Sequence, residues 1–317
     1  MIKKQHIAVL LGGVLLGCGG SSGFNSGFPD PPATKVDYPT GPGIDGGSTL
    51  RTYKAGDTWI YNVSGTMLRE EYDDQAKLKT KNSGPVTGKL IRQVSAITFQ
   101  GAPALKFTDA LTYAINGGLT TVEILEHYAR QEASGDLTML GRRDNNTDCG
   151  NATKVWLPAS FVAGSNRGGV ANFTGLGTYR DSNNILRTYD DSLNTSTAMS
   201  VTAQQSVPST SGAPFTTWRA VYAERFANDF AAATRVVRSS EFIGPSYKLK
   251  SVEEISAIDD WAASLGAPVQ RGYQTTRTDT IVDKSTIDTT TGVVTFEVHL
   301  EKRMLDLRMV LASRTLQ

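Results

Sequence analysis

The sequence predicts a mainly β fold with a minor share of helix, built from long antiparallel strands in curved sheets or half-barrels. Three observations predict it. Apolar and polar residues alternate with period two, clusters of Gly, Asn, Asp, Ser and Pro separate the alternating runs, and several runs reach about ten to fourteen residues. Strands usually have about five or six residues, so these lengths favour a strongly curved sheet over a compact sandwich.

The folded body is expected to begin near Tyr53, with a first strand over residues 57–66. Trp59, Tyr61 and Val63 share one face of this run, and polar residues occupy much of the other. This alternation is typical of a strand that buries one face.

A second long strand is expected from Pro103 to Ile115. Its apolar face carries Leu105, Phe107, Leu111 and Tyr113. Asp109 interrupts that face. If the sheet holds an apolar ligand, we expect these four apolar side chains to face it.

Further strands and one helix follow. The alternation predicts strands over residues 218–226, 247–249, 293–305 and 305–311. The segment Ile258–Leu265 is the exception, because Asp259 and Asp260 stand near its start and Gly266 follows it. Acidic residues in a first turn and a terminal glycine predict one short helix there.

An internal repeat predicts how the sheet was assembled. Gly56 recurs as Gly168 and Gly65-Thr66 as Gly177-Thr178 at an offset of 112, and Gly101-Ala102-Pro103 recurs as Gly212-Ala213-Pro214 at 111. We therefore expect two related sheet units, at about residues 51–160 and 161–270, followed by C-terminal strands over 271–317.

The N-terminus carries an export signal. Lys3 and Lys4 precede an apolar stretch over residues 7–17, which is too short to cross a membrane as a helix. The stretch ends in Leu15-Leu16-Gly17-Cys18, and on these residues the chain resembles bacterial lipoproteins.

The lipoprotein resemblance implies removal of residues 1–17 and a diacylglycerol on the sulfur of Cys18. A third acyl chain, usually palmitate, would occupy the new amine, so the protein would be anchored to a membrane. Gly19 stands where enteric bacteria place the Asp that retains a lipoprotein in the inner membrane. We therefore expect a lipid-anchored protein of the cell envelope and, in a Gram-negative cell, the outer membrane over the inner one.

Residues 18–50 are rich in Gly, Ser and Pro and are expected to form a flexible tether. Gly19–Gly23 matches the nucleophile-elbow pattern G-x-S-x-G, and Gly41–Gly46 matches the dinucleotide-binding pattern G-x-G-x-x-G. Neither match has the strand before it and the helix after it that its chemistry requires. We interpret both as chance matches in a glycine-rich linker.

Composition narrows the function classes. With 32 basic and 31 acidic residues the formal net charge is +1, which gives no electrostatic basis for binding nucleic acid. The chain has two cysteines, so acylation of Cys18 would leave Cys149 without an intramolecular disulfide partner. Cys149 is then either a turn residue or a thiol that reacts or forms an intermolecular bridge.

The sequence gives little support for a catalytic or metal-binding role of His127 or His299. Glu123 and His127 are four residues apart, which on a strand is about 13 Å and too far to share a metal ion. Glu297, His299 and Glu301 share one strand face, opposite Phe296, Val298 and Leu300, and that face is expected to be solvated. We expect both histidines to be ordinary surface residues, and we expect no metal and no cofactor.

Two further features of the sequence could carry chemistry. Asp144–Gly150 spaces oxygen ligands as a calcium loop does, but Val155 occupies the twelfth position, where a bidentate Glu belongs. A polar turn is the preferred interpretation. Asp109 and Glu224 interrupt apolar strand faces and would be the candidate carboxylates of a hydrolase.

Three functions remain open. The first is non-catalytic binding of an apolar ligand, lipid or peptide, by a sheet that resembles in general form the curved-sheet lipid carriers among bacterial lipoproteins. The second is a structural or assembly lipoprotein that contacts envelope proteins. The third is a hydrolase. The absence of a catalytic motif favours the first two.

Overall fold

The computed structural model describes residues 38–144, 147–180, 186–229, 248–287, 290 and 294–317. The predicted fold class is confirmed, because these residues are nearly all strand. The strands are β1 (Thr58–Tyr72), β2 (Leu78–Phe99), β3 (Ala102–Ile115), β4 (Thr120–Gln131), β5 (Leu137–Asp144), β6 (Thr147–Cys149), β7 (Lys154–Leu157), β8 (Asn166–Arg180), β9 (Leu186–Val207), β10 (Phe215–Asp229), β11 (Lys248–Ala262), β12 (Ala267–Ile287) and β13 (Val294–Thr315). The expected signal peptide over residues 1–17, Cys18 and most of the expected tether lie outside the described residues.

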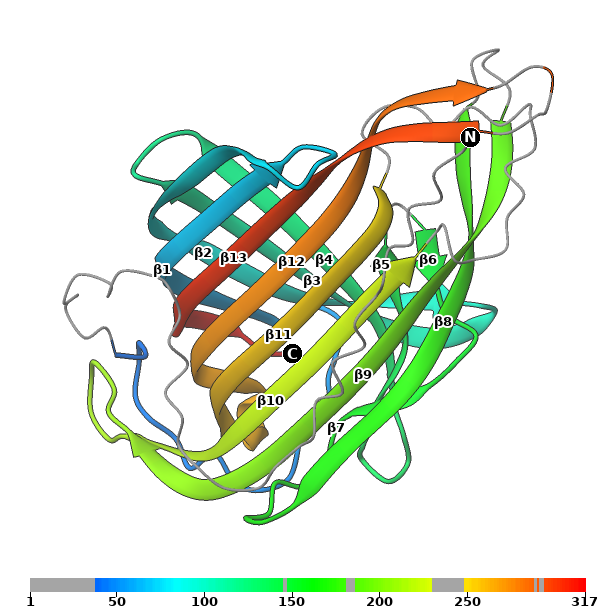
Figure 1. The fold of residues 1–317 in the computed structure, drawn as a ribbon. Helices are drawn as coiled ribbons and strands as arrows, with labels where there is room; N and C mark the ends of the chain where they lie inside the picture. Colours follow the sequence, from blue (N-terminus) through cyan, green and yellow to red (C-terminus); the bar gives the residue numbers. More distant parts are fainter. Residues whose placement is uncertain (1–37, 145–146, 181–185, 230–247, 288–289, 291–293) are drawn as a thin grey trace. The chain divides into compact units, whose positions relative to one another are not determined.

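The strands form one antiparallel sheet that curls into a nearly closed barrel (Figure 1). Its order is β6-β5-β4-β3-β2-β1-β13-β12-β11-β10-β9-β8, with β7 paired to β5. β13 therefore lies beside β1, although almost the whole body separates them in sequence. The two ends of the sheet meet where Gly150 and Thr174 pair across the gap. The predicted duplication stays a prediction, and β12 runs through its expected boundary at residue 270.

The predicted helix at residues 258–265 is wrong over most of its length. Residues 258–262 end β11, and only Ala263–Leu265 form a single 3-10 turn, which stops at Gly266 with φ of 67°. Strand alternation sends Asp259 and Asp260 to opposite faces. Each finds an arginine on a neighbouring strand, so the acids pair across the sheet instead of capping a helix.

Residues 38–50, the described end of the expected tether, lie against the barrel. Gly43 donates a backbone hydrogen bond to Ala213 at 2.9 Å and Gly46 donates one to Thr216 at 3.0 Å. A Cβ on either glycine would come within about 2.2 Å of backbone atoms in the 213–216 segment. The G-x-G-x-x-G match therefore serves close backbone approach. We name residues 38–50 the strap.

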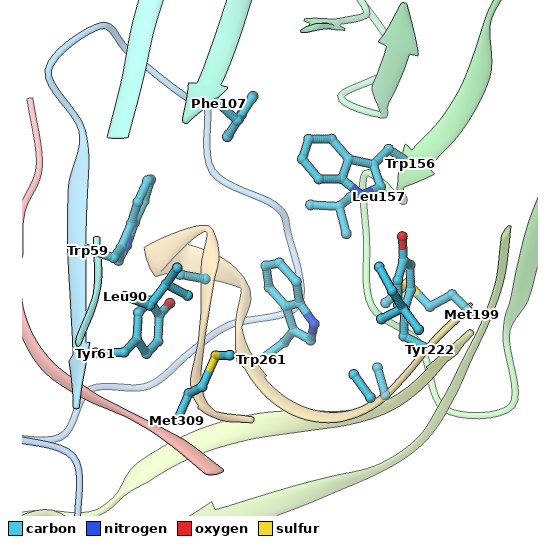
Figure 2. Close-up of a cluster of buried hydrophobic side chains, with 14 of the residues drawn as sticks. Trp59, Tyr61, Leu90, Phe107, Trp156, Leu157, Met199, Tyr222, Trp261 and Met309 are labelled. Carbon is cyan, nitrogen blue, oxygen red and sulfur yellow. The ribbon is translucent and has the colours of Figure 1, made fainter. Parts of the chain in front are cut away.

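An aromatic core fills the barrel beside the strap (Figure 2). The predicted inward face of the first strand is confirmed, because Trp59, Tyr61 and Val63 are all buried. Phe107 packs edge-on against Tyr53 at 5.1 Å between ring centroids and against a tryptophan of β7 at 5.2 Å. This end of the barrel is thus closed by packed rings.

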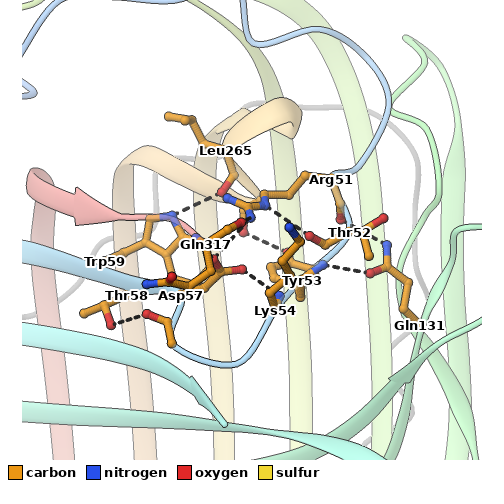
Figure 3. Close-up of polar contacts among 12 residues, drawn as sticks. Arg51, Thr52, Tyr53, Lys54, Asp57, Thr58, Trp59, Gln131, Leu265 and Gln317 are labelled. Carbon is orange, nitrogen blue, oxygen red and sulfur yellow. Dashed lines mark hydrogen bonds and ion pairs between the residues drawn. The ribbon is translucent and has the colours of Figure 1, made fainter. Parts of the chain in front are cut away.

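The buried carboxylate of Asp57 joins Gln317 to Arg51, the residue that follows the strap (Figure 3). Asp57 Oδ1 accepts a hydrogen bond from the backbone N–H of Gln317 at 2.9 Å, and Arg51 forms an ion pair with the same oxygen at 3.2 Å. Trp59 Nε1 donates to the carbonyl of Leu265 at 3.1 Å. These bonds satisfy polar groups at the closed end and fix the rings there.

Candidate functional site

A cavity of about 500 Å³ lies inside the curled sheet. One part of its wall is apolar and includes Leu90, Leu111, Leu157, Met199, Trp261 and Met309, several of which Figure 2 shows around the open space. The rest of the wall is charged. Asn82 and Thr121 belong to the lining and are exposed, so the cavity reaches solvent at the end opposite the strap.

The four residues expected to face a ligand separate into two pairs. Leu111 and Tyr113 line the cavity. Phe107 is 1% exposed within the aromatic core, and Leu105 is half-buried against that core. The alternation correctly placed all four side chains on the inner side, but the cavity occupies only part of the barrel's length.

Asp109 lies in the barrel as one partner of a buried ion pair. Arg92, its cross-strand neighbour on β2, donates one hydrogen bond to each oxygen of the Asp109 carboxylate, at 2.7 Å and 2.6 Å. A carboxylate held by both oxygens is neutralised in place. The hydrolase hypothesis needs an acid that is available to a substrate, and this geometry does not favour Asp109 for that role.

Glu224 is inward and buried as well. Lys154 Nζ lies 2.7 Å from Glu224 Oε1 and also bonds Thr195 and Thr197, and the hydroxyl of Tyr222 donates to the second carboxylate oxygen at 2.5 Å. Burial lowers the pKa of Lys154, and Glu224 partly opposes that shift. The carboxylate is a structural partner in this network.

A third pair joins Arg142 of β5 to Glu253 of β11 across the barrel. Arg142 Nη2 lies 2.5 Å from Glu253 Oε2. Burial alone would raise the pKa of Glu253, but the positive charges of Arg142 and Arg277 lower it below its ordinary value. The guanidinium of Arg142 also covers the face of Phe226, with Cζ 3.8 Å from the ring centroid.

Asp259 forms an ion pair with an arginine but lacks a well-formed hydrogen bond at one carboxylate oxygen. Its Oδ1 lies 3.0 Å from Arg271 Nε, yet neither atom has a hydrogen bond of acceptable geometry among the described residues. Burial raises the pKa of Asp259, and the attraction of Arg271 offsets only part of that shift.

His127 is not the surface residue that we expected. The side chain lines the cavity and is 4% exposed, with its ring 5.0 Å from the Trp156 ring and 6.2 Å from the Phe226 ring. Neither ring nitrogen has a hydrogen-bond partner within the described part of the chain. Burial lowers the pKa of His127 well below its ordinary value, and the nearby cations, Arg142 foremost, lower it further. The ring is therefore neutral at physiological pH.

The face bearing Glu297, His299 and Glu301 was also expected to be solvated, and this expectation is wrong for Glu301. Glu301 lines the cavity and accepts a hydrogen bond from Arg69 at 2.6 Å. Leu305 and Leu307 set the odd-numbered residues of β13 inward, and the alternation continues through Arg303 to Glu301. His299 is partly buried and lies 2.7 Å from Asp283.

The open end of the cavity carries further ion pairs. Arg303 bonds Glu123, which also accepts a hydrogen bond from the hydroxyl of Tyr113 at 2.6 Å. Arg277 pairs with Asp279 at 3.0 Å. Sequence reasoning missed all of these arginines, although each stands in phase with apolar residues of its strand.

The described residues of the Asp144–Gly150 segment belong to the antiparallel β5–β6 pair or follow it. Asp144 pairs with Thr147 and Arg143 with Asp148 in the β5–β6 register, while residues 145–146 lie outside the described residues. Within the described ranges no group of three His, Cys, Asp or Glu side chains could hold a metal ion. Cys149 is fully buried, which leaves its thiol inaccessible to a partner from solvent.

No protein-family model matches this chain, and no curated protein matches it. The part of the chain that the structure describes contains no helix of the length and apolarity needed to cross a membrane.

Proposed function

We propose that this protein binds a small, largely apolar ligand in the cavity of its barrel, without catalysis. The cavity carries this proposal. Its volume of about 500 Å³ lies within the roughly 300–1,000 Å³ of small-molecule sites. Such sites combine an apolar wall with a few polar groups that fix orientation, and this lining combines Leu90, Leu111 and Met309 with charged pairs.

We further propose that the protein is a lipid-anchored component of the cell envelope and that it binds its ligand at the outer membrane. The support is the Leu15-Leu16-Gly17-Cys18 motif, which lies outside the described residues. Lipid on Cys18 would keep the barrel near a source of apolar molecules.

Native mass spectrometry of the full-length protein, purified from its source cells, tests the binding proposal. We expect a co-purifying small molecule at fixed stoichiometry. Leu111→Trp should fill the cavity and abolish this adduct, whereas Val170→Trp, on an exposed position of β8, should retain it. A wild-type protein that carries no adduct and takes up no apolar probe would contradict the proposal.

One observation favours a second candidate function, contact with an envelope protein. Val122 and Ile124 on β4 are 59% and 66% exposed. β5 pairs with β4 only over residues 127–131. Among the described residues, the first half of β4 therefore has no neighbouring strand on the side that faces β5, and its backbone forms a free edge there. An edge with outward apolar residues suits strand addition by a partner. A photo-crosslinker at position 124 should then capture one envelope protein, and Val122→Glu should remove the crosslink.

A further inference from the structure

Two buried side chains on neighbouring strands, both in the wall of the cavity, have hydrogen-bonding groups that no described residue uses. His127 of β4 and Arg142 of β5 are direct cross-strand partners, and both line the cavity. Nδ1 and Nε2 of His127, and Nε and Nη1 of Arg142, have no hydrogen-bond partner among the described residues. Buried polar groups are normally satisfied, so a cluster of unsatisfied ones in a cavity indicates where a ligand binds.

The unused groups are mainly donors. Arg142 offers N–H groups on two nitrogens, the Nε of Arg303 is likewise buried without a partner, and the imidazole always presents at least one N–H. A guanidinium has no acceptor. The ligand must therefore supply acceptor oxygens at this place.

The surrounding charges favour a negative acceptor near His127. Four cations act on the ring, namely Arg142, Arg92, Lys154 and Arg271. Each has a carboxylate partner of its own, but Arg142 uses only Nη2 for Glu253. Its remaining N–H groups can therefore meet a second oxygen acceptor beside His127.

The charge of that acceptor is limited by the rest of the wall. The lining contains six arginines and seven acidic residues, so acids outnumber arginines by one and a second negative charge on the ligand would add net repulsion. A planar carboxylate carries one charge and fits the planar guanidinium.

We infer that the ligand is an amphiphile with a single carboxylate, which binds Arg142 and His127 while its apolar part lies along Leu90, Leu111 and Met309. This inference rests on the proposed function and specifies the ligand class of the same cavity.

Isothermal titration calorimetry on the full-length protein tests it with decanoate below its critical micelle concentration and decanol below its solubility limit. The probes share a chain length and differ in the carboxylate. We expect decanoate to bind at least about tenfold more tightly than decanol, because charge-assisted hydrogen bonds to buried groups raise the binding affinity by that factor or more.

Two variants locate the carboxylate. His127→Phe keeps an aromatic ring and removes both nitrogens, and the double variant Arg142→Gln with Glu253→Gln removes the ion pair without leaving one buried charge alone. Each should weaken decanoate binding about tenfold or more and change decanol binding less than threefold.

The outcomes separate the two proposals. Equal affinity of the wild-type protein for both probes, or decanoate binding that neither variant weakens, would overturn the carboxylate inference and leave the cavity proposal standing. Failure of both probes to bind the wild-type protein would overturn the cavity proposal together with the inference.

Discussion

The neutral, buried imidazole of His127 makes the stability of this protein sensitive to mild acid. Burial and the surrounding cations hold the pKa of His127 well below 6.5 in the folded protein, whereas the unfolded chain titrates near that ordinary value. Below pH 6.5 the unfolded state therefore binds a proton that the folded state does not bind. This contribution to stability is complete above pH 6.5 and is lost as the pH falls.

The magnitude follows from linkage. If the folded protein takes up no proton at this ring between about pH 7.5 and about pH 5.5, the free energy of unfolding falls by about 1.4 kcal/mol over that window from this residue alone. The other ionisable side chains around the ring are the same in the wild-type protein and in variants of His127. The effect of His127 is therefore read as a difference between proteins.

Urea unfolding at the two pH values, followed by tryptophan fluorescence, measures this difference. His127→Phe and His127→Gln both lack the titrating ring, and they differ in polarity, so their absolute stabilities will differ. Both should lose about 1.4 kcal/mol less than the wild-type protein on acidification. If the wild-type protein and both variants lose the same free energy, His127 is not held neutral by burial and the reasoning is refuted.

Three further outcomes are expected. Asp109→Ala should lower the free energy of unfolding by about 3–5 kcal/mol because it leaves Arg92 buried without its partner, and the double change Asp109→Leu with Arg92→Met should recover most of that loss in urea titrations. Gly43→Ala should detach the strap and speed its proteolysis, because a Cβ there would lie 2.2 Å from backbone atoms, whereas Thr40→Ala, which shortens an exposed side chain of the strap, should leave the strap protected. Cys18→Ser should yield an unprocessed precursor without lipid in metabolic labelling, and efficient maturation to a soluble form would show that the signal is an ordinary one.

Local patterns predicted the correct fold class and the correct inner faces of β1 and β3. Trp59, Tyr61 and Val63 are buried as the period-two alternation predicts, because a strand with one apolar face has only one favourable orientation toward a core. The same alternation placed Leu111 and Tyr113 inward, where they line the cavity.

The wrong predictions concern ionisable residues whose neighbours in the sequence are compatible with two different structures. Asp259 and Asp260 read as a helix start, and His127 read as a surface residue, because sequence alone does not show the partners that make a charge or an imidazole acceptable in a strand. Those partners, Arg271 for Asp259 and Trp156 beside His127, come from other strands.

By itself the sequence determined the fold class and the inward apolar residues of β1 and β3, because the alternation that predicts them is a local property. The tertiary structure alone decided that the sheet curls nearly shut and encloses a charged cavity. Lys154 meets Glu224 across 70 residues and Arg142 meets Glu253 across 111. Such pairs depend on strand order and register, which are fixed by packing over the whole barrel and leave no mark in the spacing of the residues.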